Sequence, residues 1–343
     1  MLRITPTAVR TWADEIGITN LLLAELDFHL VHILDVIAKD TWLEDRLYLK
    51  GGTAINKLYL RDLSRLSVDI DFNHIGPKDR VLSEKKELSE RLIEATKSLD
   101  NSYVLKIKKK RYELTRIHVT YQSIAIGTKQ HIKIEISHVE RFPILHPVKK
   151  QLRLPMEEKK SIMTYTPEEL IATKIRALHD RRKGRDVYDL WSLSRTLNLD
   201  KVAIRKLFLY YYYQSRKVFN PKLFFPRLKR AIEENEFKDD VTGFIRVDVD
   251  FNLREEIYNV IDWLGFLSGL DEADRDFLHI ARVLLGKGEI PKIKREEIAM
   301  IKHPLKHLFK DEYDITKEAS QIKTRDIMPY LTRSKKGTAR DST

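Results

Sequence analysis

The amino-acid sequence predicts an α+β fold, with a mixed sheet in the first half of the chain and a helical domain in the second. Alternating apolar and polar residues, typical of strands, recur before about residue 140. Apolar residues at helical spacing dominate from Glu168 to about Lys310. A chain of 343 residues also exceeds the usual size of one compact core, which favours two domains.

The first half is expected to begin with an amphipathic helix, followed by a strand, a glycine turn, a second helix and a second strand. The Gly51-Gly52 pair marks the turn. Helices are predicted at 19–39, 53–61 and 79–98. Strands are predicted at 46–50, 67–75, 102–109, 112–121 and 130–138. The last three are expected to be antiparallel.

The second half is expected to be helical from the point where Thr166 can cap a helix that has Pro167 in its first turn. We place the domain boundary near 155–165. The final stretch carries six Lys or Arg residues against two Asp and lacks apolar periodicity. The predicted regions are therefore 1–160, a core with N-terminal helices; 161–320, a helical domain; and 321–343, a basic mobile tail.

The composition narrows the possible partners and locations. There are 63 Lys plus Arg residues against 51 Asp plus Glu, and the net charge of +12 favours contact with a polyanion such as nucleic acid. A membrane surface or an acidic protein would satisfy the same charge. Because there is no cysteine, disulfides, thiolate zinc sites and cysteine nucleophiles are excluded. No apolar run is long enough for a signal peptide core or a membrane span, so we expect a cytoplasmic protein with no membrane partner.

Two carboxylates share one face of the strand predicted at 67–75. Side chains alternate along a strand, so Asp69 and Asp71 point one way while Ile70 and Phe72 point the other. Two like charges at this spacing favour a bound cation, and hard oxygen ligands suit Mg²⁺. Taken alone, the pattern also fits an exposed edge strand with two solvated acids.

The glycine turn makes the metal site more specific. Gly51 and Gly52 lie 18 and 17 residues before Asp69, between a predicted strand and a predicted helix. Glycines at such a place let backbone N–H groups approach a phosphate, and the hydroxyl of Thr53 could add a further donor. A tight turn without a ligand is the alternative for the glycine pair alone.

A third acid on a neighbouring strand is expected if two metal ions, roughly 3.5–4 Å apart, act together. Glu135 is the first candidate, because alternation places it with Lys133 and Ser137 on the polar face of its strand. Glu113 and Glu140 are weaker alternatives.

Basic residues gather where the helical half begins. Lys174 lies in the helix that starts near Glu168, and the Arg181-Arg182-Lys183-Gly184-Arg185-Asp186 segment follows. These cations could hold a triphosphate. A salt-bridged helix surface is the alternative.

Four segments together resemble the AbiEii/AbiGii toxin family of nucleotidyltransferase-like proteins, over about residues 20–200. They occur in the family's order and are Leu49–Ala54, Arg65–Asp71, Glu169–Lys174 and Arg185–Leu190. The resemblance implies a DNA polymerase β-like nucleotidyltransferase core, followed by a helical domain that completes the active site and binds the acceptor. The common nucleotidyltransferase signature has Gly-Ser where this chain has Gly52-Thr53, and both side chains are small hydroxyls.

The resemblance also implies a reaction and its residues. Family members include type IV toxin–antitoxin toxins, and MenT-like members add nucleotides to the 3′ end of tRNA. We therefore expect transfer from an NTP to RNA with release of pyrophosphate, two Mg²⁺ ions, tRNA as acceptor, blocked translation and a cognate antitoxin. The expected catalytic residues are Asp69, Asp71, Lys174 and Asp186. The expected nucleotide-binding residues are Gly51, Gly52, Thr53, Lys174, Arg182 and Arg185, and the expected metal ligands are Asp69, Asp71 and Glu135.

Secondary roles and rival functions remain open at this point. Glu135 could also receive the hydroxyl proton, Arg181 could assist Lys174, and Asp186 could orient Lys174 or Arg185. Basic segments that could bind the acceptor are 106–111, 149–150 and the aromatic-basic stretch 210–230, where tyrosines could stack on bases. The rivals are a nucleic-acid-binding regulator with an inactive pocket, a metal-dependent nuclease and a glycosyltransferase that uses Asp-x-Asp.

Overall fold

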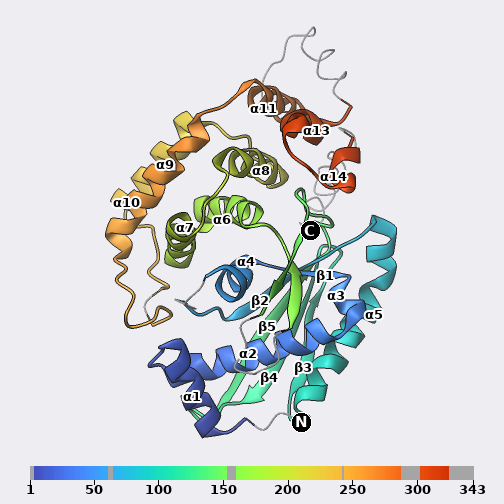
Figure 1. The fold of residues 1–343 in the computed structure, drawn as a ribbon, viewed down its shortest axis with the longest axis vertical. Coiled ribbons are helices and arrows are strands. Elements are labelled where there is room, and N and C mark those ends of the chain that lie inside the picture. The colour runs from blue at the N-terminus through green and yellow to red at the C-terminus, as the bar shows by residue number, and fades with distance from the viewer. Residues whose placement is uncertain (1–3, 61–64, 153–159, 242, 287–301, 324–343) are drawn as a thin grey trace, which may run out of the picture.

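A seven-stranded mixed sheet forms the centre of the first half of the chain (Figure 1). The computed structural model describes residues 4–60, 65–152, 160–241, 243–286 and 302–323. The strands are β1 (Leu47–Lys50), β2 (Asp69–His74), β3 (Val104–Lys110), β4 (Leu114–Gln122), β5 (Lys129–Ser137), β6 (Val148–Gln151) and β7 (Ser161–Thr164). Their order is β3-β4-β5-β2-β1-β7-β6. The β2–β5 and β1–β7 pairs are parallel and the remaining pairs are antiparallel.

Helices cover the apolar face of this sheet and form the second half of the molecule. The helices of the first half are α1 (Pro6–Ile16), α2 (Leu21–Lys39), α3 (Thr41–Glu44), α4 (Gly51–Ala54) and α5 (Lys78–Leu99). Those of the second half are α6 (Pro167–Arg181), α7 (Gly184–Thr196), α8 (Lys201–Gln214), α9 (Pro221–Glu233), α10 (Leu253–Trp263), α11 (Glu272–Leu284), α13 (Pro304–Phe309) and α14 (Lys317–Gln321). Figure 1 shows α4 between the sheet and the helices α6 and α7.

Strand alternation determines which face is covered. On β4 and β5, side chains such as Ile117, Ile132 and Ile134 are completely buried, whereas their neighbours along the strands are partly exposed. Helix α2 lies against the buried face, where the carboxylate of Glu25 accepts hydrogen bonds from Ser123 Oγ (2.6 Å) and the Ile124 backbone (2.6 Å). The opposite face is therefore left for polar side chains.

The predicted α+β elements of the first half are largely present, but α1, α3, β6 and β7 were missed. Helix α1 has clear local signals, since Thr5 caps it, Pro6 begins it and Gly17 ends it with a φ of 66°. Strands β6 and β7 have four residues each, too short for a clear alternation. They matter because β7 joins the sheet beside β1, where Thr164 Oγ1 donates to the Leu49 carbonyl at 2.7 Å.

Two other expectations are revised, and a third lies largely outside the described residues. Helix α4 begins at Gly51 itself and continues as a π-helix over Ile55–Tyr59, so the glycines form the first turn of the helix. The tyrosines at 210–213 are at most 6% exposed in α8, so the structure contradicts a base-stacking role for them. Of the predicted mobile tail, 324–343 lies outside the described residues.

A buried ion pair fixes the glycine-bearing helix to α2. Lys57, in the π-helical segment, and Asp27, in α2, are both completely buried, and their Nζ and Oδ1 atoms are 2.6 Å apart. Trp12 Nε1 donates to Asp27 Oδ2 at 3.0 Å. Removing one charge from such a pair leaves the other buried without compensation.

We predict that Asp27→Ala lowers the free energy of unfolding by about 3–5 kcal/mol, because Lys57 then remains buried without its counter-charge. The Asp27→Leu, Lys57→Met double variant should recover most of this loss. Urea unfolding followed by circular dichroism measures both. Lys86→Ala, which removes an exposed pair with Glu90, is the control and should change the midpoint little. Equal midpoints for wild type and Asp27→Ala would refute the role of this pair.

Candidate active site

The parallel pairing of β2 with β5 brings the predicted carboxylates together. Asp71 lies opposite Glu135, and Asp69 lies opposite Lys133. Residues opposite one another in register point to the same face of a sheet. Asp69, Asp71 and Glu135 therefore form one cluster on the polar face, as the alternation of both strands predicted.

Lys133 supplies a positive charge inside this cluster. Its Nζ lies 3.0 Å from Asp69 Oδ2 and 3.6 Å from Glu135 Oε1. Burial works against the charged form, yet the hydrogen bond and charge of Asp69 raise the Lys133 pKa above its usual value. Arg116 lies 2.6 Å from Glu135 on the other side. Two of the three carboxylates are thus already neutralised by side chains of the protein.

Asp71 is the carboxylate with the least compensation. Burial raises its pKa, and the neighbouring charges of Asp69 and Glu135 raise it further, although Lys50 and Lys133 act in the opposite direction. Gly51 packs directly against it with a φ of 70°, and a Cβ there would lie 2.9 Å from Asp71 Oδ2. Glycine at 51 is therefore required both by the backbone conformation and by the approach of this carboxylate.

Gly52 and Thr53 contact the residues that lead into β2. A Cβ on Gly52 would lie 2.6 Å from Nη2 of Arg65, so the helix can approach the guanidinium this closely only with glycine. The buried Thr53 hydroxyl hydrogen-bonds with the Ser67 hydroxyl at 2.6 Å and with the Asp69 carbonyl oxygen. Thr53 thus positions the strand that carries Asp69, and its role in phosphate binding stays a prediction.

A buried chain of alternating charges connects β2 with the helical half. Arg65 makes two hydrogen bonds to Asp189, at 2.7 and 2.8 Å. Lys174 Nζ lies 2.7 Å from Asp189 and 3.1 Å from Asp186. Arg181 then donates twice to Asp186, at 2.7 Å each. Although burial opposes it, the charges of Lys174 and Arg181 lower the Asp186 pKa to about 2, which keeps this carboxylate ionised at neutral pH.

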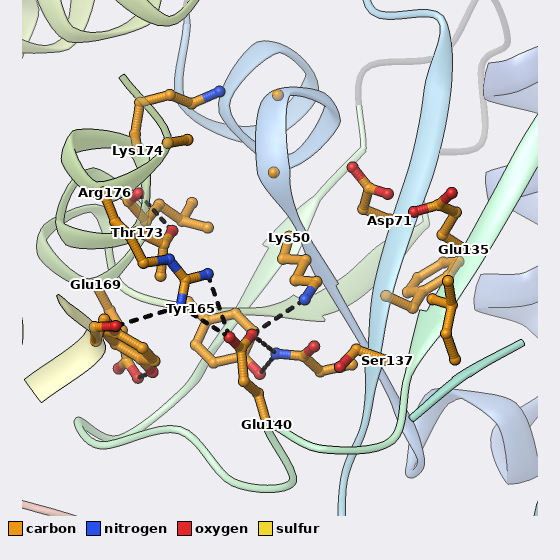
Figure 2. A pocket seen from close by; sticks show the side chains of 18 of the residues that line it. Lys50, Asp71, Glu135, Ser137, Glu140, Tyr165, Glu169, Thr173, Lys174 and Arg176 are labelled. Atoms are coloured by element: carbon orange, nitrogen blue, oxygen red, sulfur yellow. Dashed lines mark hydrogen bonds and ion pairs between the residues drawn. The ribbon is translucent and has the colours of Figure 1, made fainter. Parts of the chain in front are cut away.

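The carboxylates and the charge chain meet at a cavity of about 370 Å³. Figure 2 shows Asp71 and Glu135 side by side on neighbouring strands, with Lys174 and Arg176 on the helix across from them. The charged side chains and glycines that line the cavity are Lys50, Gly51, Gly52, Asp71, Glu135, Glu140, Glu169, Lys174, Arg176 and Arg181. A cavity with carboxylates on one wall and cations on the other suits a metal-bound polyphosphate.

A second charged group lies on the floor of the cavity. Glu140 accepts from Lys50 Nζ at 3.1 Å and from Arg176 at 3.2 Å (Figure 2). Burial opposes ionisation, but Lys50 and Arg176 together hold the pKa of Glu140 well below its usual value. Glu140, a weaker candidate for the third metal ligand, is thus engaged by two cations, as Glu135 is, but Glu135 lies opposite Asp71 in the sheet.

The structure brings together most of the predicted site residues and separates two. Arg182 is ion-paired with Glu236, and Arg185 donates to Asp240 at 2.9 Å, so both face the segment after α9 and lie outside the cavity lining. Their role in nucleotide binding stays a prediction, and Arg181 has the better placement.

The residues of the site that were not identified from the sequence include Arg65, Asp189, Lys50, Arg176 and Arg116. Asp189 follows Asp186 by one helical turn, which was a usable signal for a shared face. The roles of Lys50, Arg65 and Arg176 depend on contacts between distant segments, and no local pattern reveals them.

The oxygen ligands of this cluster fit a divalent metal. Within the described ranges, no three acidic or histidine side chains are already gathered around a common metal position. Instead, the ammonium group of Lys133 lies where a cation between Asp69 and Glu135 is needed. Carboxylate oxygens are the ligands that Mg²⁺ prefers, so Asp69, Asp71 and Glu135 fit this ion once the Lys133 ammonium group moves out of its place.

Among the helices that the structure describes, none has the length and apolar character of a membrane span.

Comparisons with known proteins identify the family and the fold. A family model described as "Nucleotidyl transferase AbiEii toxin, Type IV TA system" matches residues 33–279. Among solved structures, MenT4, a nucleotidyltransferase toxin from Mycobacterium tuberculosis H37Rv, matches with a TM-score of 0.63 and 19% identity over 86% of this chain and 97% of that one. JHP933 from Helicobacter pylori matches with a TM-score of 0.44 and 17% identity over 76% and 97%. A search of curated proteins gave no match.

The likeness to MenT4 confirms the predicted α+β fold with its mixed sheet, and at this level of identity it concerns the fold alone. The family model covers well over half of the chain and includes the glycine pair, the three carboxylates and the charge chain. The chain therefore belongs to the AbiEii nucleotidyltransferase toxin family of type IV toxin–antitoxin systems.

Proposed function

We propose that this protein transfers a nucleotide from an NTP to the 3′-hydroxyl of an RNA, with tRNA as the acceptor and blocked translation as the result. The observation that carries the proposal is the cluster of Asp71, Glu135 and Asp69 beside Gly51, facing the cations of α6 across one cavity. Family membership adds the expectation of a cognate antitoxin.

Each residue has a distinct task in the proposed reaction. Asp69, Asp71 and Glu135 would hold Mg²⁺, which when bound neutralises the phosphates and activates the attacking oxygen. Arg181, whose side chain is 52% exposed and lines the cavity, binds the triphosphate. Asp186 orients Arg181 and Lys174 through the hydrogen bonds it accepts from both. Lys174 is only 5% exposed, so it stabilises the triphosphate through its positive charge beside Arg181.

The bond changes follow from this arrangement. The 3′-hydroxyl oxygen of the acceptor forms a bond to the α-phosphorus, and the bond from that phosphorus to the bridging oxygen of the β-phosphate breaks. Pyrophosphate leaves with the electron pair toward Arg181, where positive charge stabilises it. The hydroxyl proton passes to a carboxylate, for which Asp71 and Glu135 are the two candidates because they face each other across β2 and β5.

Incubation of the protein with each labelled NTP, Mg²⁺ and total RNA tests the proposal directly. Label at the 3′ end of RNA is the expected result. Shortened RNA without label would instead support a nuclease, and bound but unchanged RNA would support a nucleic-acid-binding regulator. Either of these two outcomes contradicts the proposed function.

We predict that Asp71→Asn abolishes nucleotide transfer and leaves the fold intact, since it removes a metal-binding charge without opening a space. Because the pKa of Asp71 is raised in the folded state, its ionised form destabilises the fold at neutral pH. Asp71→Asn should therefore melt at a higher temperature than wild type at pH 7, and the difference should shrink as acidification protonates Asp71. Melting curves across this pH range measure it, and full transfer activity of the variant would refute the site.

We predict that Arg181→Ala raises the NTP concentration needed for half-maximal rate, because the triphosphate loses a partly exposed guanidinium. Arg185→Ala, which removes the same kind of charge from outside the cavity lining, is the matched control and should change this value much less. Initial rates over a range of NTP concentrations compare the two. An equal effect of both variants would contradict the assignment of Arg181.

A further inference from the structure

A group of cationic and aromatic side chains extends from the carboxylates across the polar face of the sheet. We call this group the basic sheet face; it consists of Lys106, Arg116, His118, His131 and Lys133. Lys106 lies opposite His118, and His118 lies opposite Lys133, so these side chains share one face of three neighbouring strands. Helices α2 and α5 pack on the other face, where the carboxylate of Glu84 on α5 lies 3.6 Å from His74 of β2.

Two imidazoles form a flat platform in the middle of this face. The rings of His118 and His131 are stacked, with centroids 4.7 Å apart and planes inclined by 6°. His131 is exposed, so the outer side of the stack is open to a ligand. Burial and the surrounding cations, which include Lys108 and Arg116, lower the pKa of His118. This direction favours the uncharged imidazole, and the ring offers an aromatic surface.

The platform is continuous with the carboxylate cluster. His131 precedes Glu135 by four residues on β5, a separation of about 13 Å along a strand. Lys133 lies between them and contacts both Asp69 and Glu135. At the far edge, Lys106 on β3 is exposed and makes no ion pair with any described residue. Cationic side chains thus lie at both ends of the platform, Lys106 at the far edge and Arg116 and Lys133 beside the carboxylates.

We propose that the basic sheet face binds the last nucleotides of a single-stranded RNA acceptor and directs its 3′-hydroxyl to Asp69 and Asp71. An unpaired base stacks on the His118–His131 platform, and a backbone phosphate contacts Lys106. Proteins recognise single-stranded RNA by this combination of aromatic stacking and positive charge. The inference rests on the proposed function and specifies the acceptor's position.

The first test compares binding of a labelled single-stranded RNA oligonucleotide, without NTP or metal, by fluorescence anisotropy. His118→Ala, His131→Ala should bind about tenfold more weakly, since base–aromatic stacking is lost. The His118→Phe, His131→Phe variant should retain the affinity, because a phenyl ring also stacks. Wild-type affinity of the alanine variant would overturn the inference, as would equal losses in the alanine and phenylalanine variants.

The second test separates phosphate contact from general charge. Lys106→Glu should weaken RNA binding and lower the slope of log affinity against log salt concentration by roughly 0.7 or more. Lys97→Glu, the same change at an exposed position on α5, is the control and should leave the slope nearly unchanged. Equal slopes for both variants would overturn the phosphate contact.

The outcomes also separate this inference from the proposed function. RNA that binds at the platform but never acquires a nucleotide would refute the transfer reaction and retain the inference. Normal transfer with an unaltered acceptor requirement in the alanine variant would retain the reaction and refute the inference.

Discussion

The buried charge chain from Arg65 through Asp189, Lys174 and Asp186 to Arg181 is the interaction on which the site depends. Charges inside a protein are costly unless each has a partner, and in this chain every inner charge has one on each side. Arg65 lies under Gly52 and at the entry of β2, whereas the other four belong to α6 and α7. The same contacts therefore hold the carboxylate strand and the cationic helix in a fixed relation.

The carboxylate cluster is balanced in a different way. Its negative charges are offset by side chains that remain movable, because Lys133 and Arg116 are each about one-third exposed. Such groups can exchange one partner for another at low cost. On one side of the cavity the charges from Arg65 to Asp186 are buried and paired, and on the other the charges can adjust when ligands arrive.

The sequence predicted the carboxylates and glycines of the site better than the contacts that hold them in place. The alternation of β2 and β5 was enough to place Asp69, Asp71 and Glu135 on one face, and the glycine pair was correctly placed beside them. The partners of Lys174 were only partly foreseen: Asp186 was, but Asp189 was not. Arg65 was not foreseen either, because its contact with Asp189 joins residues 124 positions apart. In helix α8 the sequence instead suggested a role that the structure contradicts. The tyrosines at 210–213 could have stacked on bases, but they are buried, and composition alone cannot distinguish a buried tyrosine run from an exposed one.

The domain boundary illustrates the same limit. A change from strand to helix patterns near residue 160 is visible in the sequence, yet β7 follows a stretch with few strand signals and belongs to the sheet. Its pairing with β1 is a parallel contact across more than a hundred residues. Parallel neighbours need a long connection, so neither strand's own sequence identifies the partner.

The parallel pairing of β1 with β7 has a consequence for the order of synthesis. On the ribosome the N-terminal part of a chain emerges first, but β1 lacks its second neighbour until Thr164 has been made. The ion pair of Arg65 forms later still, because its carboxylate partner is Asp189. A nascent or prematurely terminated chain that stops before this point carries the glycines and the three clustered carboxylates without the contacts that align them. For a toxin, this delays the assembly of an active site until more than half of the polypeptide exists.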